Sequence, residues 1–220
     1  MVFIYWKDPV KEPARQLIRA AMLGAGLCVP VALVEHVIQT MLFGANPESV
    51  SLVDSTLKAF FVAALPEEAA KLFILWLVVR SNKYFDEHID GIVYAVYVSL
   101  GFAAIENVFY VLGSDNWLSV AFTRSLLSVP GHYAFAVLMG YYYSLYRFVR
   151  PTRRNAVMTL LVPVMAHGVY DALAMSGEAN PLVGGLAFFV LIYFCIKMHR
   201  IAARHIVTLI NKDSSSTPSV

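Results

Sequence analysis

Long apolar segments constrain the fold of this chain more than any other feature of its sequence. Of its 220 residues, 59% are hydrophobic and only 15% are charged, and a soluble domain of this size needs far less apolar surface. Each apolar segment has roughly the 20 residues with which a helix spans a bilayer. The segments lie at residues 17–43, 57–79, 89–112, 122–146, 155–175 and 182–200. The sequence therefore predicts an all-α fold, a polytopic transmembrane helical bundle of about six spanning helices.

The two ends of the chain are more polar than the segments between them. Residues 1–16 form a proline-containing head, and residues 201–220 form a tail. The end of the tail, from Asn211 to Val220, is rich in serine and is predicted to be disordered. Residues 17–200 are predicted to form a single transmembrane domain between these two ends, with the tail partly disordered.

Four of the apolar segments contain an internal proline, at Pro30, Pro66, Pro130 and Pro163. Proline has no backbone N–H, and its ring clashes with the preceding helical turn. Each of these prolines is therefore expected to kink its helix or to open it locally. Near Pro66, the freed carbonyl groups would be available to water or to a substrate.

Basic residues alternate between the loops and predict the orientation of the chain. Lysine and arginine occur in the head, in residues 80–83, in residues 147–154 and after residue 196. The loops at 44–56, 113–121 and 176–181 contain none. Because cytoplasmic loops of membrane proteins are enriched in these residues, the alternation predicts six spans with both termini in the cytoplasm.

The second segment carries three charges in the middle of an apolar run, at Glu67, Glu68 and Lys71. An isolated charge at that depth is costly, so these groups need partners, water or a function. Lys71 follows the two glutamates by four and three residues, spacings that place side chains on one helical face. Lys71 is predicted to pair with one glutamate and hold it ionised. The two carboxylates would then suit different roles, one as a general base and one as an acid or positioning group.

Ionisable groups in three other segments lie at a similar depth. At about 1.5 Å of rise per residue, Glu67 lies roughly 15 Å from the outer end of its segment. Glu106 lies roughly 9 Å from the outer end of its own segment, and His132 and His167 both fall at roughly 12–15 Å. Independent charges would not be expected to share one layer in the outer half of the membrane. We therefore expect these four spans to build one site.

Two further polar residues lie next to this layer in the sequence. Asp171 follows His167 by four residues, so its carboxylate can orient the imidazole. Asn107 follows Glu106 directly and adds an amide. Both are expected to support the site.

Arg124, Ser128 and His132 are spaced four residues apart and are predicted to share one face of the fourth segment. Taken alone, a histidine such as His132 is more often an interhelical hydrogen-bonding contact than a catalytic group. Arg124 alone favours a structural or interfacial role. The pair Glu35-His36 in the first segment has no partner at helical spacing and is assigned to cavity lining or to an interface.

Two classes of function fit this set of residues. The cluster could activate a water molecule for peptide-bond hydrolysis, or it could bind and move a proton or an ion as a transporter does. A catalytic Zn²⁺ site is a variant of the first class, although the HExxH spacing of many zinc proteases is absent. The candidate metal ligands would be Glu67, Glu68, Glu106, His132 and His167. A non-catalytic scaffold is a third possibility, but it leaves the shared depth unexplained.

Five motifs then occur in order along the chain. They are Pro66-Glu67-Glu68-x-x-Lys71, Phe85-Asp86-Glu87-His88-x-Asp90-Gly91-Ile92-Val93-Tyr94, Ser99-Leu100-Gly101-Phe102-Ala103-x-x-Glu106-Asn107, His132 with Met139-Gly140-Tyr141-Tyr142, and His167-Gly168-x-Tyr170-Asp171. Together they resemble the PrsW family of intramembrane proteases, within the superfamily of the CAAX prenyl endopeptidases. That wider superfamily shows a similar pattern, but with arginine at the position of Lys71 and histidine at that of Glu106.

The resemblance implies a bacterial plasma-membrane protease that makes the first, outer-side cut in a single-span anti-sigma factor. A second intramembrane protease then completes the release of the sigma factor, and a stress response follows. The implied partners are this substrate and the lipid bilayer, with no nucleic acid. Family members usually have another span before the segment that matches Lys7-Asp8-x-x-x-Glu12-Pro13. This chain begins at that segment, so either it lacks the family's first span or its true start codon lies upstream.

By motif, the resemblance implies that Glu67, Glu68 and His167 are catalytic, with Glu106 and His132 assisting them. In the favoured mechanism no cofactor is required, and Glu67 acts as the general base on a water molecule, assisted by Glu68 or Glu106. His132 positions the water or the substrate, and His167 stabilises the oxyanion or protonates the leaving amine. The residues expected to support this machinery are Lys71, Asn107, Arg124 and Asp171.

Overall fold

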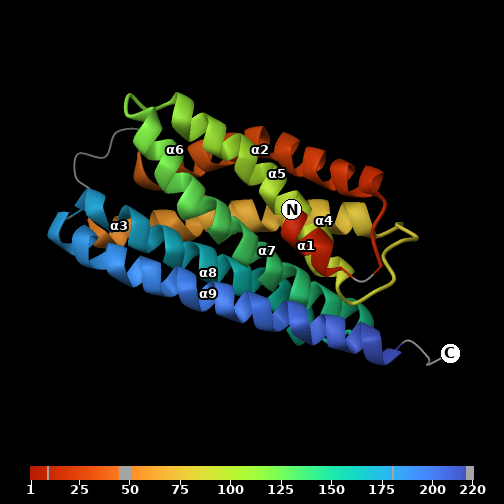
Figure 1. Cartoon of the computed structure of the whole chain (residues 1–220). Coiled ribbons are helices and arrows are strands. Elements are labelled where there is room, and N and C mark those ends of the chain that lie inside the picture. Colours follow the sequence, from red (N-terminus) through yellow and green to blue (C-terminus); the bar gives the residue numbers. More distant parts are fainter. Residues whose placement is uncertain (9, 45–50, 180, 217–220) are drawn as a thin grey trace.

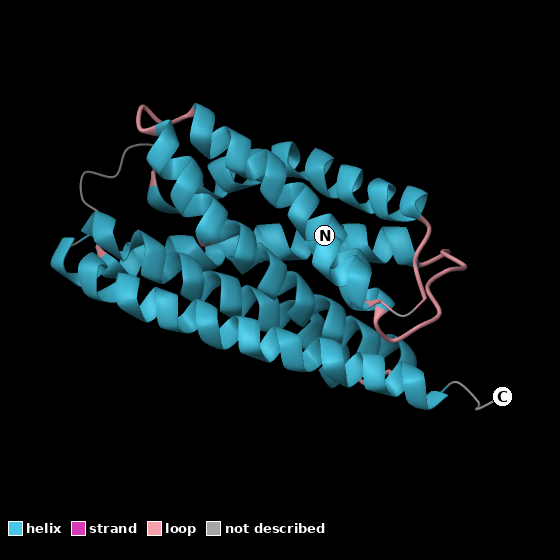
Figure 2. Ribbon diagram, in the orientation of Figure 1, coloured by secondary structure: helices cyan, strands magenta, loops and turns pink. Residues whose placement is uncertain are grey.

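The structure is a computed structural model that describes residues 1–8, 10–44, 51–179 and 181–216. In these residues all regular structure is helical, and no strand is present (Figure 2). The elements are α1 (Val2–Lys7), α2 (Ala14–Phe43), α3 (Leu52–Leu57), η1 (Lys58–Ala64), α4 (Leu65–Val79), α5 (Asp90–Leu112), α6 (Trp117–Leu126), α7 (Ser128–Ser144), η2 (Leu145–Val149), α8 (Arg153–Ala179) and α9 (Pro181–Ser216).

Each predicted apolar segment corresponds to one helical run of the bundle (Figure 1). Four runs are single helices, α2, α5, α8 and α9, and each contains a stretch that is long and apolar enough to cross a membrane. The other two runs are composite: α3, η1 and α4 follow one another directly, as do α6, α7 and η2 apart from Leu127. The prediction of an all-α, polytopic membrane bundle is confirmed.

The four prolines have different effects on their helices. Pro66 follows the π-helical segment η1, in which the backbone N–H of Leu65 bonds to the carbonyl of Phe60, five residues earlier. Pro130 lies just after Leu127, whose φ of −118° marks the break between α6 and α7. Both are the local irregularities that proline was predicted to cause. By contrast, α2 and α8 continue through Pro30 and Pro163.

The helix α5 lies at the centre of the bundle and packs against α2 on one side and α7 on the other. The close approach of α2 and α5 depends on small residues. A Cβ atom at Gly24 would meet the backbone of Val98, and one at Gly101 would meet the backbone of Ala21. Because these helices nearly touch, the polar residues on their halves toward the α5–α6 turn are brought within reach of the same cavity.

The loops that carry basic residues lie at one end of the bundle, and the loops without basic residues lie at the other end. In Figure 1 the junction of α1 with α2, the loop of residues 80–89 and the end of α9 lie at one end, while the α5–α6 turn and the α8–α9 junction lie at the other. This grouping is the one that the basic residues predicted. The orientation of the two ends across the membrane stays a prediction.

The C-terminal residues differ from the prediction, because α9 continues to Ser216. Residues 211–216 are therefore helical rather than disordered, and residues 217–220 lie outside the described part of the chain. The extension is held by Asp213, whose carboxylate accepts hydrogen bonds from the backbone N–H groups of His88 (2.7 Å) and Ile89 (3.0 Å). The side chain of Leu209, one turn earlier, is fully buried.

Candidate active site

The charged triplet of the second apolar run occupies the start of α4. Glu67 and Glu68 are 4% and 0% exposed, and Lys71 is 1% exposed. The ammonium of Lys71 lies 2.8 Å from a carboxylate oxygen of Glu67 and 2.8 Å from one of Glu68. The prediction that Lys71 pairs with only one glutamate is therefore wrong. On this helix, i,i+3 and i,i+4 spacings bring both carboxylates to the same ammonium.

His132 joins this triplet to Glu106 on α5. Its Nδ1 atom lies 3.2 Å from the Lys71 ammonium, and its Nε2 atom lies 2.9 Å from a carboxylate oxygen of Glu106. An ammonium can only donate, so Nδ1 accepts and the ring proton is on Nε2, from which His132 donates to Glu106. The arrangement fixes both the tautomer and the orientation of the ring.

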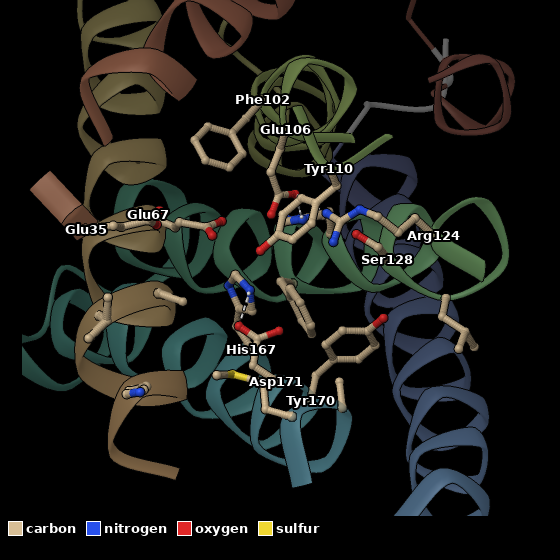
Figure 3. Close-up of a pocket in the computed structure, with 18 of the residues that line it drawn as sticks. Glu35, Glu67, Phe102, Glu106, Tyr110, Arg124, Ser128, His167, Tyr170 and Asp171 are labelled. Atoms are coloured by element: carbon tan, nitrogen blue, oxygen red, sulfur yellow. Dashed lines mark hydrogen bonds and ion pairs between the residues drawn. The ribbon is translucent and has the colours of Figure 1, made fainter. Parts of the chain in front are cut away.

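His167 lies between two carboxylates. Its Nδ1 atom is 2.9 Å from Glu68 and its Nε2 atom is 3.2 Å from Asp171, the contact that their i,i+4 spacing predicted (Figure 3). The ring also stacks on Phe135, with the ring centroids 4.8 Å apart. A histidine can donate to both carboxylates only when it carries both ring protons, so the surroundings of His167 favour the imidazolium form.

Arg124 and Asn107 complete the polar network. The guanidinium of Arg124 lies 2.8 Å from Glu106 and over the ring of Tyr110, and its Nε donates to the side-chain oxygen of Asn107. The break at Leu127 interrupts the helical face that Arg124 was predicted to share with His132. Both side chains nevertheless contact the carboxylate of Glu106, where the positive charge of Arg124 can neutralise it.

A cavity of about 610 Å³ lies beside this network, in the half of the bundle toward the α5–α6 turn. All six helical runs contribute to its lining. Successive residues of a helix point about 100° apart, and the two glutamates differ accordingly. Glu67 lines the cavity, whereas Glu68 and Lys71 lie behind it. Glu106, His132, His167 and Asp171 also line it, so the predicted layer of ionisable groups surrounds one chamber (Figure 3).

Comparison with known proteins identifies the family. The family model described as "PrsW family intramembrane metalloprotease" matches residues 12–198. The chain belongs to the PrsW family.

Several curated PrsW proteases cover most of the chain. Protease PrsW of Oceanobacillus iheyensis is 33% identical over 210 residues, which are 95% of this chain and 92% of the relative. Protease PrsW of Clostridioides difficile is 36% identical over 80% of this chain and 74% of its own. That of Bacillus subtilis is 34% identical over 87% and 84%. No solved structure matches. This PrsW-family protein is therefore a peptidase of the membrane, and the resemblance seen in its motifs is confirmed.

The sequence predicted that Glu35 lines a cavity or an interface, but it was not assigned to the layer of the other ionisable groups. Glu35 on α2 lines the cavity and lies on the same side of it as Glu67 (Figure 3). One of its carboxylate oxygens is buried and accepts no hydrogen bond. Its neighbour His36 is exposed. Cavity lining is thus confirmed for Glu35. Its depth could have identified it, because it lies eight residues from Phe43, or about 12 Å, in the same layer as the other ionisable groups.

The donors of this PrsW-family site suit a metal ion in number and type. Glu67, Glu68 and His132 each offer one ligand atom, and these atoms lie within 4.8 Å of one another. His132 has its unprotonated nitrogen toward this group and donates from the other nitrogen to Glu106, as zinc-bound histidines do. The Lys71 ammonium contacts the same three side chains. The residues therefore fit a divalent ion, with Lys71 as the group that it would displace.

Proposed function

We propose that this PrsW-family protease hydrolyses a peptide bond near the outer side of a single-span membrane protein, with Glu67 as the general base. The observation that carries the proposal is the difference between the two glutamates. Glu67 alone of the triplet lines the cavity, while Lys71 and Glu68 lie behind it. A carboxylate at the wall of a cavity can take a proton from a water molecule held there.

The neighbouring residues suit the other steps of hydrolysis. As Glu67 takes the proton of the attacking water, the scissile carbonyl gains a negative charge on its oxygen. His167 lines the same chamber and is surrounded by Glu68 and Asp171, a setting that favours a protonated ring. Such a ring stabilises the oxyanion or gives its proton to the leaving amine. Lys71 holds the Glu67 carboxylate in position, and Glu68 holds the ring of His167 in position.

His132 and Glu106 serve to position the reactants. The ring of His132 is fixed by hydrogen bonds at both nitrogens, and Arg124 neutralises part of the charge of Glu106. Fixed donors and acceptors of this kind orient water and substrate without reorganising during the reaction.

A zinc-dependent version of the same hydrolysis is the second candidate, and the convergence of Glu67, Glu68 and His132 favours it. A bound Zn²⁺ would polarise the scissile carbonyl and lower the pKa of a water molecule. In that case these three residues would hold the ion, and Glu106 would orient His132 as a metal ligand. The two versions differ in the position of Lys71, because only the zinc-dependent version requires its ammonium to move away from these three side chains.

We further propose that the substrate is a single-span anti-sigma factor, that the protein lies in the bacterial plasma membrane, and that a second intramembrane protease acts on the product. The position of the cavity supports a cut on the outer side. Its lining comes from the half of the bundle opposite the basic loops, which is the outer half in the predicted orientation. Membership of a protease family disfavours the transporter interpretation.

The test is reconstitution of the purified protein in liposomes with a single-span anti-sigma factor. The cleaved bond is mapped by mass spectrometry, with and without a chelator and with Zn²⁺ added back. A cut on the outer side of the substrate span is expected. Full activity of metal-free protein supports the water-only mechanism, whereas loss with chelator and recovery with Zn²⁺ supports the metal version. A cut only on the basic-loop side would contradict the proposed topology.

A further inference from the structure

A second group of acidic residues lies at the end of the bundle that carries the basic loops, away from the active-site cavity. Asp8 follows α1, Glu87 belongs to the loop of residues 80–89, and Asp90 begins α5 (Figure 1). Asp8 and Asp90 are each only 1% exposed, and Glu87 is partly buried. Three carboxylates from three separate segments are thus brought together in a site that the protease mechanism does not use.

The spacing of these carboxylates suits a single cation. One oxygen from each of Asp8, Glu87 and Asp90 lies within 4.8 Å of the other two. Two oxygens that bind one Ca²⁺ at about 2.4 Å each can be no more than about 4.8 Å apart. The spacing meets this requirement, so small movements of the side chains would let one ion contact all three carboxylates.

Four oxygens of the group accept no hydrogen bond. They are both carboxylate oxygens of Asp8, Oε2 of Glu87 and Oδ1 of Asp90. The backbone N–H groups of Val10 and Glu12 point toward the Asp8 carboxylate, but neither makes a hydrogen bond of good geometry with it. A buried acceptor without a partner is costly, and a buried carboxylate is more costly still. Within the described residues, neither carboxylate oxygen of Asp8 accepts a hydrogen bond of good geometry.

Lys11, three residues after Asp8, donates hydrogen bonds to backbone carbonyls, and its positive charge also acts on the Asp8 carboxylate. The ammonium of Lys11 donates to the backbone carbonyls of Tyr5 (2.6 Å), Trp6 (3.3 Å) and Asp8, and so caps the end of α1. Three carboxylates this close together, two of them buried, repel one another when ionised, and a bound cation would offset that repulsion.

Oδ2 of Asp90 connects the loop of residues 80–89 to the start of α5. It accepts hydrogen bonds from the backbone N–H groups of Asp86 (2.9 Å) and Glu87 (2.7 Å). These bonds fold the end of the loop over the start of α5. Oδ1 of Asp90 accepts no hydrogen bond of good geometry, although the carboxyl group of Glu12 lies close to the Asp90 side chain. The geometry is therefore fixed by the backbone rather than by flexible side chains.

We propose that Asp8, Glu87 and Asp90 bind one hard divalent cation, Mg²⁺ or Ca²⁺, which ties the segment after α1 to the loop of residues 80–89 and to α5. Ligands that are all carboxylate oxygens favour these hard ions over Zn²⁺. The site is independent of the protease chemistry, because it lies at the other end of the bundle from Glu67.

The test is thermal unfolding of the full-length protein in detergent after treatment with chelator. Addition of millimolar Ca²⁺ or Mg²⁺ should raise the melting temperature of the wild type by about 2–4 °C or more, since a ligand that binds only the folded state stabilises it. Asp8→Asn should remove this rise. Asp86→Asn is the matched control, because it removes the same charge from an exposed position in the same loop and should keep the rise.

The melting temperatures of the wild type and the variants without added cation distinguish a cation site from a cluster that is only structural. Without added cation, Asp8→Asn should melt at the same temperature as the wild type or above it, because it removes one buried negative charge. If Asp8→Asn does not fold, Glu87→Gln replaces it in this test, because the side chain of Glu87 is partly exposed. The active-site variant Glu67→Gln should retain the rise. Absence of a rise in the wild type, an equal rise in Asp8→Asn or Glu87→Gln, or loss of the rise in Glu67→Gln would overturn the proposal.

Discussion

Glu67 and Glu68 are adjacent in the sequence but have different surroundings. Glu67 faces the cavity and pairs with Lys71. Glu68 is fully buried and contacts both Lys71 and His167. We therefore expect the first carboxylate to serve the reaction directly and the second to hold the site together.

The Glu68→Gln change should lower the stability of the protein more than Glu67→Gln does. It removes one negative charge between Lys71 and His167, and breaking a buried ion pair costs up to about 3–5 kcal/mol. At Glu67 the cavity allows water to replace part of the lost interaction. Thermal unfolding of the two variants in the same detergent measures the difference. Equal melting temperatures, or a lower one for Glu67→Gln, would show that the assignment of the two roles is wrong.

Contacts within one helix could be predicted from the sequence, and contacts between helices could not. The spacing of Asp171 after His167 predicted a pair that the structure contains, and that of Lys71 predicted a pair with one glutamate where the structure has pairs with both. The contacts of Lys71 with His132 and of Glu68 with His167 depend on how each helix is rotated about its axis. An apolar segment that is hydrophobic all round does not specify that rotation.

At the scale of the helices, the site depends on the close packing of α5 against α2. The contact is made where Gly24 faces the backbone of Val98 and Gly101 faces that of Ala21. Glu35 on α2 and Glu106 on α5 lie beyond this contact and line the same cavity. Any separation of these two helices would move both carboxylates.

We expect Gly24→Ala to destabilise the protein, and Gly26→Ala to leave its stability unchanged or slightly higher. An added methyl group at Gly24 meets the backbone of Val98, and overpacking of this kind costs about 1–3 kcal/mol. Nothing lies within 4 Å of a Cβ at Gly26, and alanine is a better helix former by about 1 kcal/mol. Melting temperatures of the two variants give the comparison. A neutral Gly24→Ala would mean that the helices are not in contact there.

The number of helical runs followed from the apolar pattern, but their interruptions and ends did not. Pro130 predicted an irregularity, yet the break falls three residues earlier at Leu127. Similarly, the serine-rich composition after Asn211 predicted disorder, whereas α9 continues because Asp213 accepts hydrogen bonds from the loop of residues 80–89. In both cases a tertiary contact or a turn overrides the local composition.

At the scale of the whole molecule, the two acidic sites lie at opposite ends of the bundle. The cavity with Glu67 is on the side of the α5–α6 turn, and the group of Asp8, Glu87 and Asp90 is on the side of the basic loops. If the basic loops face the cytoplasm, the protease site opens toward the outer side and the proposed cation site toward the cytoplasm.

This orientation predicts the accessibility of introduced cysteines. In a variant with Cys28 and Cys195 replaced by alanine, Arg150→Cys should react with an impermeant thiol reagent only after the cell membrane is opened. Ser114→Cys, in the α5–α6 turn, should react in intact cells and serves as the control. Labelling of Arg150→Cys in intact cells would reverse the topology and place the cavity on the cytoplasmic side.

The central claim is that Glu67 performs the chemistry of peptide hydrolysis. The most direct measurement is the single-turnover rate of cleavage by wild type and by Glu67→Gln in the same liposomes, with thermal unfolding to confirm that both are folded. Loss of a general base is expected to reduce the rate by about 10²–10⁴-fold. A folded Glu67→Gln protein that cleaves within about tenfold of the wild-type rate would contradict the account.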